Sequence, residues 1–259
     1  MYAKKKRMKP RISAVILTKN EQEHIVFCIK SLLWCDEIVI VDDYSVDKTL
    51  EKIASLKKPL TIFQRKLDGN FSEQRNFGLA KTSGEWILFV DADEVVTDAL
   101  KHEILTSLQN NHDISGFEIR RVDSVWGGPL RYGEGGNMKL LRLVKKHHGL
   151  WKGKVHEVLA VKGEVQSLTQ PLLHYPHNDI SEFLNKINFY TTIRAKELYS
   201  QQKKVHFLSM LCYPIGKFVL NYFLKRGFLD GTVGLVHAML MSFHSFMVRG
   251  KLWLLWQKK

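Results

Sequence analysis

Acidic and polar side chains follow three apolar segments in the N-terminal hundred residues, at the point where each segment ends. The first segment is followed by Thr18-Lys-Asn-Glu21, the second by Asp42-Asp43-Tyr-Ser45 and the last by Asp91-Ala-Asp93-Glu94. An Asp-x-Asp pair at the end of a buried strand offers the hard oxygen ligands that Mg²⁺ and Mn²⁺ prefer, and it leaves positions open for phosphate oxygens. A cation held there would neutralise the charge on a departing diphosphate.

The same side chains also suit a purely structural role. Asp, Asn and Ser commonly cap helices and fill turns, and this interpretation is favoured for Ser45 or Asp47 taken alone. Capping does not explain why acidic pairs occur at both 42–43 and 91–93. Neighbouring carboxylates repel each other unless a cation or a set of hydrogen-bond donors lies between them. A ligand site is therefore the preferred interpretation.

Alternating apolar runs and helical patterns are expected to position these groups. Strands are predicted at 12–17, 37–41, 60–63 and 86–90, with helices at 20–33, 45–56, 71–80 and 97–108. Continuous apolar strands separated by helices indicate a parallel sheet that is covered on both faces. In such a sheet ligands bind beyond the carboxyl ends of the strands, and this is where the polar segments occur.

Composition and charge exclude several classes of protein. With 45% hydrophobic and 25% charged residues, the chain is neither disordered, collagen-like nor a disulfide scaffold. Its three cysteines form no C-x-x-C pair, which supports neither a zinc ribbon nor a disulfide framework and fits a reducing compartment. Residues 1–110 hold 17 Lys and Arg against 16 Asp and Glu, whereas residues 111–259 hold 22 against 10. The C-terminal part is thus expected to meet an anionic partner, either nucleic acid or an anionic membrane face.

Four parts are predicted along the chain. They are a basic N-terminal tail (1–10), an α/β half (11–110), a mixed part that supplies an acceptor surface (111–180) and a helical, membrane-associating region (181–259). The short apolar run after the basic tail does not have the pattern of a secretory signal, so the cytoplasmic side is expected.

The C-terminal stretch Gly231–Val248 contains 18 residues without a formal charge. A transmembrane helix is conceivable at this length, but the glycines, histidines and serines in the stretch favour an interfacial or buried amphipathic helix. Simple packing against the main domain is the other alternative. The excess of Lys and Arg nearby favours the membrane.

Several segments together resemble the family 2 inverting glycosyltransferases, which have the GT-A fold. The segments that carry the resemblance are Arg11–Glu21, Ile38–Asp47, Gln74–Ala80 and Gly84–Glu94. Trp151–Glu157 and Gly227–Gly231 are similar to a bacterial subgroup that includes the lipopolysaccharide inner-core β-glucosyltransferases. The resemblance implies an α/β fold of GT-A type. Its mostly parallel nucleotide-binding sheet has flanking helices and is followed by a mixed acceptor region and a helical C-terminal part.

The resemblance also implies a role for each matching residue on the donor side. The residues expected to line the nucleotide pocket are Thr18, Asn20 and Glu21. Asp43 is expected to meet the uracil with Ser45 nearby, and Arg75 to help hold the nucleotide. At Tyr44 the chain departs from the commonest pattern, in which a glycine or another small residue is frequent.

Metal and acceptor roles follow from the same resemblance. Asp93 is expected to bind Mg²⁺ or Mn²⁺ together with the diphosphate, and Asp91 to contact the ribose or the metal. Glu157 stands where the family has its catalytic base. The structural alternatives are that Glu157 pairs with a neighbouring lysine, that Arg75 lies on a helix surface and that His174 is a loop or surface histidine instead of an extra metal ligand.

The expected activity is transfer of a sugar, glucose above all, from a nucleotide-sugar donor such as a UDP-sugar to a glycolipid acceptor such as the lipopolysaccharide inner core. A single displacement needs one carboxylate to accept the proton of the acceptor hydroxyl and one site that stabilises the departing diphosphate. The enzyme is expected on the inner face of the cytoplasmic membrane. A polyprenyl phosphate or a capsule glycan is the alternative acceptor. A basic nucleic-acid-binding protein is a more distant alternative, for which no motif appears.

Overall fold

The computed structural model describes residues 10–110, 113–134, 136, 138–153, 157–176 and 179–257. The chain forms two compact units. The first unit consists of Met1–Arg121 and Lys139–His174, and the second unit of Val122–Met138 and Tyr175–Lys259. Residues 1–9 of the predicted basic tail lie outside the described residues. The division into four functional parts stays a prediction.

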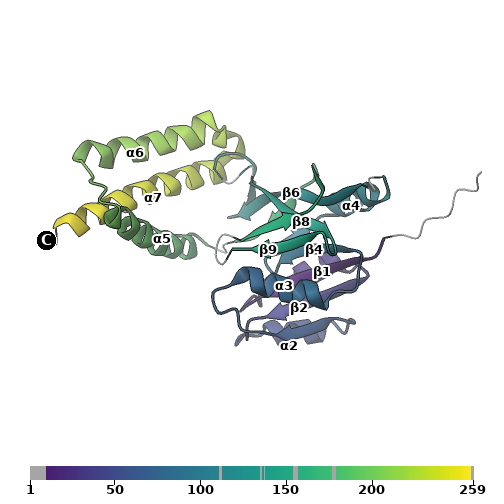
Figure 1. The fold of residues 1–259 in the computed structure, drawn as a ribbon. Coiled ribbons are helices and arrows are strands. Elements are labelled where there is room, and N and C mark those ends of the chain that lie inside the picture. Colours follow the sequence, from purple (N-terminus) through teal and green to yellow (C-terminus); the bar gives the residue numbers. More distant parts are fainter. Residues whose placement is uncertain are drawn as a thin grey trace, which may run out of the picture. The chain divides into compact units, whose positions relative to one another are not determined.

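A parallel sheet forms the centre of the first unit (Figure 1). Its strands, in the spatial order β3-β2-β1-β4, are β1 (Ile12–Thr18), β2 (Glu37–Asp42), β3 (Thr61–Gln64) and β4 (Trp86–Asp91). The register pairs Thr18 of β1 with Asp42 of β2, and Leu17 of β1 with Asp91 of β4. The polar ends of these three strands therefore lie at one edge of the sheet, as predicted.

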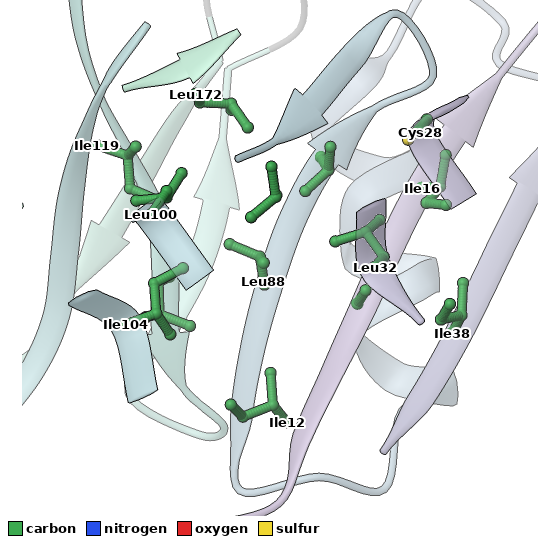
Figure 2. Packing of buried hydrophobic residues seen from close by; sticks show 14 of the residues in the cluster. Ile12, Ile16, Cys28, Leu32, Ile38, Leu88, Leu100, Ile104, Ile119 and Leu172 are labelled. Atoms are coloured by element: carbon green, nitrogen blue, oxygen red, sulfur yellow. The ribbon is translucent and has the colours of Figure 1, made fainter. Parts of the chain in front are cut away.

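Helices cover the larger core on one face of this sheet. They are α1 (Ile25–Leu32), α2 (Thr49–Ser55) and α4 (Asp98–Asn110). Ile12 and Ile16 of β1 pack with Leu32 of α1 and Leu88 of β4 in this core (Figure 2). Successive side chains of a strand point to opposite faces, which is why only alternate residues of β1 and β4 enter it.

The opposite face of the sheet carries a smaller core. Val15 and Phe89 point to this face, where they pack with Trp151 and Leu159. Trp151 lies in β9 (Gly149–Lys152) and Leu159 in β10 (Val158–Val161), two strands that pair with each other outside the main sheet. Helix α3 (Phe71–Lys81) also covers this face and contacts β1, β2 and β9 (Figure 1).

Two helices begin later than the sequence predicts. The first, α1, was expected from residue 20 or 21 and the second, α2, from residue 45. Asn20 has a positive φ of 54°, which ends the strand in a turn instead of starting a helix. Ser45 donates its hydroxyl proton to Asp42 at 2.5 Å, so that its side chain closes a loop. The residues ahead of each helix thus form loops at the edge of the sheet.

A mixed part extends the sheet beyond β4 in the order β4-β8-β6-β12-β5, in which β8 runs antiparallel to β4 and β12 antiparallel to β5. These strands and their neighbours are β5 (Glu94–Val96), β6 (Ile114–Val125), β7 (Gly128–Leu130), β8 (Met138–Lys145), β11 (Glu164–Ser167) and β12 (Leu172–His174). The pairing of β12 with β5 sets His174 opposite Glu94. The fold class expected from the resemblance is confirmed: a mostly parallel sheet with flanking helices, then a mixed region and a helical end.

Long helices make up most of the second unit. They are α5 (Ile180–Ser200), α6 (Phe207–Val219) and α7 (Gly231–Gln257), with a π-helical turn at Leu220–Leu224 and a 3₁₀ turn at Gly227–Asp230 between α6 and α7. Lys251 of α7 joins α7 to α5, because its ammonium donates to Asn188, Thr191 and Thr192 at 2.6–2.8 Å.

Apolar side chains of the second unit are unusually exposed. Helix α6 has no buried residue, and Phe207 and Leu208 at its start are 75% and 70% exposed. Two stretches, Phe207–Leu224 and Gly227–Gln257, are long and apolar enough to cross a membrane by length and composition. Exposed apolar surface of this kind marks an interaction site with a lipid or a protein.

Candidate active site

A pocket of about 300 Å³ opens at the carboxyl ends of β1, β2 and β4. The residues that line it are Leu17, Thr18, Lys19, Glu21, Val41, Asp43, Leu67, Phe71, Gln74, Arg75, Asp91, Ala92, Asp93, Glu157 and His174. Seven of the nine predicted site residues are in this lining, including Glu157, which is distant in sequence. The parallel register explains how the strand ends meet, because the carboxyl ends of parallel strands share one edge.

Asn20 and Ser45 are the two predicted site residues outside the lining. The backbone N–H of Asn20 donates to the Ser45 hydroxyl at 2.9 Å, and the backbone N–H of Val46 donates to the Asn20 side-chain oxygen at 2.9 Å. These bonds join the loop after β1 to the loop after β2. In this arrangement Asn20 and Ser45 shape the wall of the pocket, and their contact with a nucleotide stays a prediction.

The backbone at Tyr44 explains why glycine suits this position. Tyr44 has a φ of 51°, in the left-handed region that glycine adopts most readily. Its side chain is 55% exposed. The chain therefore tolerates a tyrosine here at some conformational cost, and the ring stands at the surface beside the loop that carries Asp43.

Asp43 is held on both sides of its carboxylate. Lys19 donates to it at 2.6 Å and the backbone N–H of Leu67 at 3.0 Å. Burial disfavours the charged carboxylate, but the hydrogen bonds from Lys19 and Leu67 outweigh it, so the pKa of Asp43 lies below its usual value. Asp43 thus presents a fixed, ionised acceptor to the pocket. Lys19 was not among the predicted site residues, although it lies between two of them.

Two arginines hold Asp91. Arg75 donates to one carboxylate oxygen at 2.8 Å, and Arg142 donates to the other at 2.7 Å. Burial opposes ionisation, yet the positive charges of Arg142 and Arg75 hold the pKa of Asp91 far below its usual range. A ribose or a metal would therefore share the Asp91 carboxylate with both arginines.

Glu94 lies behind Asp91 and is fully buried. Arg142 donates to it at 3.0 Å, and Glu94 accepts a bond from the backbone N–H of Asp91 at 2.8 Å. Burial raises the pKa of Glu94, and Arg142 lowers it only in part. Glu94 does not line the pocket. Its role is to orient Arg142 and the backbone at Asp91, so the acidic run 91–94 contains both pocket and supporting residues.

Asp93 and His174 face each other in the pocket. His174 Nε2 lies 3.2 Å from an Asp93 carboxylate oxygen. His174 was considered as an extra metal ligand, and the pairing of β12 with β5 explains how it comes to this position. The structure thus brings the carboxylate of Asp93, a predicted metal ligand, and the imidazole nitrogen of His174 to the same wall of the pocket.

The side chains around Asp93 can hold a divalent cation only together with other ligands. Within the described ranges, no three His, Cys, Asp or Glu side chains are grouped so that they could hold a metal by themselves. Mg²⁺ characteristically takes only one or two carboxylates and completes its shell with water and substrate phosphates. Asp93 with His174 fits that pattern, whereas both oxygens of Asp91 are already bonded to arginine.

Glu157 reaches the pocket beside Arg75. The Arg75 guanidinium lies 3.4 Å from the Glu157 carboxylate and stacks over the Trp151 ring, 4.7 Å from its centroid. Arg75 is 4% exposed, and its Nε and Nη1 atoms have no hydrogen-bond partner among the described residues. Within the same part of the chain, the buried Thr18 hydroxyl also has no partner. Buried donors without partners are costly, so these groups are suited to meet a bound ligand.

Arg142 is the supporting residue that the motifs did not reveal. It lies within the apolar run of β8 and is 4% exposed. A charged residue in an otherwise apolar strand is a recognisable signal, because arginine is rarely buried without a partner. Its partners, Asp91 and Glu94, belong to segments some fifty residues away, and only the pairing of β8 with β4 brings them together.

Comparison with known proteins identifies the family. The family model for glycosyl transferase family 2 matches residues 13–153. The chain belongs to this family. The matched residues contain the parallel sheet and every predicted site residue except Glu157, so this glycosyltransferase carries its pocket almost entirely within the family domain.

Relatives extend the likeness over nearly the whole glycosyltransferase. A lipopolysaccharide core biosynthesis glycosyltransferase, LpsC, of Rhizobium meliloti (strain 1021) is 29% identical over 93% of this chain and 92% of its own. An uncharacterized glycosyltransferase of Rickettsia typhi is 26% identical, over 93% and 86% respectively. A solved structure of glucosyl-3-phosphoglycerate synthase from Mycobacterium tuberculosis is 19% identical with a TM-score of 0.49, covering 73% of this chain and 78% of that one.

Proposed function

We propose that this glycosyltransferase moves glucose from a UDP-sugar to a glycolipid of the lipopolysaccharide core, with inversion at the anomeric carbon. The observation that carries the proposal is the convergence of Asp93, Arg75 and Glu157 on one pocket at the sheet edge. The likeness to a lipopolysaccharide core biosynthesis glycosyltransferase over 93% of the chain supports the class of acceptor.

The donor nucleotide binds between β1 and β2 in this proposal. Asp43 accepts a hydrogen bond from the uracil, for which its fixed and ionised carboxylate is suited. Thr18 and Glu21 line the adjoining wall, where the buried hydroxyl of Thr18 gains a hydrogen-bond partner from the nucleotide. The free N–H groups of Arg75 meet the nucleotide on the side of β4.

Asp93 and His174 are the residues that would hold the divalent cation. When bound, Mg²⁺ or Mn²⁺ supplies the positive charge that stabilises the departing nucleoside diphosphate. The residues of the chain fix the place of this charge, because Arg142 and Arg75 keep Asp91 immobile directly beside the Asp93 loop. Asp91 contacts the ribose through the face of its carboxylate that the arginines leave open.

Glu157 is the general base. It takes the proton of the acceptor hydroxyl while that oxygen attacks the anomeric carbon and the bond to the diphosphate breaks. Arg75 orients the carboxylate from 3.4 Å. One displacement inverts the anomeric configuration and needs no second, nucleophilic carboxylate. Positioned general-base catalysis contributes about 10²–10⁴-fold to the rate.

The second unit is proposed to meet the cytoplasmic face of the membrane, where a glycolipid acceptor is found. Residues of α6 supply exposed apolar surface, and the 111–259 part of the chain carries the excess of positive charge. Basic residues close to an anionic surface each contribute about 1 kcal/mol to binding. The enzyme is then peripheral, with the pocket open to cytoplasmic nucleotide sugars.

A transfer assay tests the proposal. Purified enzyme is mixed with Mn²⁺, one of several UDP-sugars and membranes from a strain that lacks this chain, and the glycolipids are analysed by mass spectrometry. The expected result is a gain of one hexose on the lipopolysaccharide core with UDP-glucose, absent with E157Q. If the hexose were found on polyprenyl phosphate or on a capsule glycan, the proposed acceptor would be wrong. If it came from another sugar nucleotide, the proposed donor would be wrong.

A further inference from the structure

A second cavity of the first unit, of about 950 Å³, lies along the β9–β10 hairpin and α3. Its lining includes Asn76, Leu79, Lys146, Leu150, Lys152 and Lys162. None of these residues lines the pocket that holds Asp93 and Glu157. The two cavities are therefore separate, and the second has no part in the donor chemistry proposed above.

Side chains of the β9–β10 hairpin point alternately to its two faces, and one of these faces lines the cavity. Trp151 and Leu159 point into the core and are 6% and 4% exposed. Leu150 and Lys152 point to the other side of β9, since successive residues of a strand alternate. Leu150 pairs directly with Ala160 of β10, so the outward face of the hairpin forms one side of the cavity.

Helix α3 places this cavity next to the active site. Asn76 donates its side-chain N–H to the Trp151 carbonyl at 2.9 Å and accepts from the Trp151 backbone N–H at 3.0 Å. These two bonds satisfy the open edge of β9 and fix α3 beside it. Asn76 lines the second cavity, and its neighbour Arg75 lines the first. Only this short part of α3 and the strand that carries Trp151 separate the two cavities, so one ligand could extend from the first cavity to the second.

A tight turn gathers the basic residues at one end of the cavity. His147 has a φ of 73°, which reverses the chain between β8 and β9. The backbone N–H of Lys162 donates to the His148 carbonyl at 2.7 Å and so brings the end of β10 to the turn. Lys146 is half-buried and donates its ammonium to the Thr82 carbonyl.

The charge of this cavity is of one sign. Lys146, Lys152 and Lys162 line it together with His147 and His148, and its described lining contains no carboxylate. Among the residues that the structure places, no Asp or Glu forms an ion pair with any of the three lysines. Like charges around a cleft repel one another, and the cleft walls concentrate their field, so an anion is attracted to such a place.

We propose that this cavity binds a phosphate or other anionic group carried by a sugar of the acceptor. The inference deepens the proposed function, on which it rests for the identity of the acceptor, and it assigns to Lys146, Lys152 and Lys162 the recognition of that group. The apolar face of Leu79, Leu150 and Ala160 meets the carbon skeleton of the sugar beside it. Acceptor selection is then partly electrostatic and lies outside the pocket where the glycosidic bond forms.

A direct binding measurement tests the proposal without any transfer reaction. Inositol hexakisphosphate, a ring that carries phosphates, is titrated calorimetrically at 150 mM salt onto the full chain with saturating UDP in the first pocket. Saturable binding is expected, at least fivefold weaker for K152E/K162E and weakened to a smaller extent for the neutral K152A/K162A. The matched control is K30E/K58E, which places the same charge change on exposed lysines of the first unit away from the cavity.

Three outcomes of the calorimetric titration would contradict the proposed anion site. No binding by the wild type, equal affinity of K152E/K162E, or an equal loss in K30E/K58E would overturn the proposal, the last because only net charge would then matter. A second experiment uses the transfer assay, in which K152E/K162E is expected to raise the KM for the acceptor at least fivefold and an unchanged KM would count against the site. If the wild type transfers no sugar at all, the proposed function fails, and the calorimetric titration still decides this inference.

Discussion

The guanidinium of Arg75 lies 3.4 Å from the carboxylate of Glu157, although 82 residues separate the two along the chain. The same guanidinium nitrogen donates to Asp91 at 2.8 Å. Arg75 thus connects the strand end that carries the Asp-x-Asp pair to the carboxylate proposed as the base. This link relates the donor side of the pocket to the acceptor side.

Replacing Arg75 with lysine is expected to lower kcat by about 10–100-fold, because a lysine ammonium loses the planar stacking over Trp151 that fixes the nitrogen between Asp91 and Glu157. The affinity for UDP should fall much less than kcat. Steady-state kinetics and calorimetric UDP binding give the two values. The matched control is R11K at the opposite end of β1, which should leave both unchanged. Equal losses in kcat and in UDP affinity would instead assign Arg75 to donor binding alone.

Asp43→Asn is expected to weaken UDP binding about tenfold, because the loss of one charge-assisted hydrogen bond corresponds to about 1.4 kcal/mol. The control is D68N, which changes an exposed aspartate of the same unit. Calorimetric titration with UDP measures both. Unchanged UDP affinity in D43N would remove Asp43 from the nucleotide site.

The pH dependence of stability follows from the same residue. The pKa of Asp43 is lowered in the folded chain, where burial is outweighed by the bonds from Lys19 and Leu67. The ionised carboxylate therefore stabilises the fold above its unfolded pKa of about 4, and this contribution is lost as the pH falls through the lower folded value. The difference in unfolding free energy between wild type and D43N should be constant from pH 5 to 7 and shrink below pH 4. A difference that grows on acidification would contradict the direction of the shift.

Arg142→Met is expected to destabilise the first unit by about 3–5 kcal/mol, since it leaves the buried Glu94 and the adjacent Asp91 without their shared cation. Arg142→Lys should recover part of the loss. Urea unfolding followed by tryptophan fluorescence measures the free energies. If R142M were as stable as the wild type, the carboxylates would have other partners and the supporting role of Arg142 would be wrong.

Removal of divalent cations with EDTA should abolish transfer, and Mn²⁺ should restore it. His174→Ala is expected to raise the Mn²⁺ concentration for half-maximal binding in the presence of UDP by about 10–100-fold. Electron paramagnetic resonance of bound Mn²⁺ reads this directly, without turnover. His102→Ala on α4 is the control and should bind Mn²⁺ as the wild type does. Wild-type Mn²⁺ affinity in H174A would leave Asp93 as the sole side-chain ligand.

The double substitution Phe207→Glu and Leu208→Glu is expected to lower severalfold the fraction of protein that floats with phosphatidylglycerol-containing vesicles. The reason is that the side chains of Phe207 and Leu208 are both exposed at the start of α6. F27E changes an exposed apolar residue of α1 in the first unit and should float as the wild type does. Equal flotation of all three proteins would show that α6 does not meet the bilayer.

The parallel half of the fold could be predicted because its signals are local. Continuous apolar runs at β1, β2 and β4 and the helical patterns between them fix the order of elements, and the rule for parallel strands then places Thr18, Asp43 and Asp91 at one edge. The helix starts could not be predicted as well, because the side-chain hydrogen bonds of Asn20 and Ser45 compete with helix formation.

The part of the site beyond β4 depends on long-range register. Strand β5 spans only Glu94–Val96, which is too short to show a period. Its pairing with β12 brings His174 beside Asp93, and the pairing of β8 with β4 brings Arg142 to Asp91. Because no local pattern encodes these registers, the sequence alone does not place Arg142 beside Asp91 or His174 beside Asp93.

A crystal structure of the enzyme with Mn²⁺ and UDP-glucose tests the central claim most directly. Anomalous scattering should locate the manganese on Asp93, with His174 beside it, and the anomeric carbon should face Glu157 across the space left for the acceptor hydroxyl. Manganese and sugar nucleotide bound away from Asp93, or an anomeric carbon turned away from Glu157, would contradict the account.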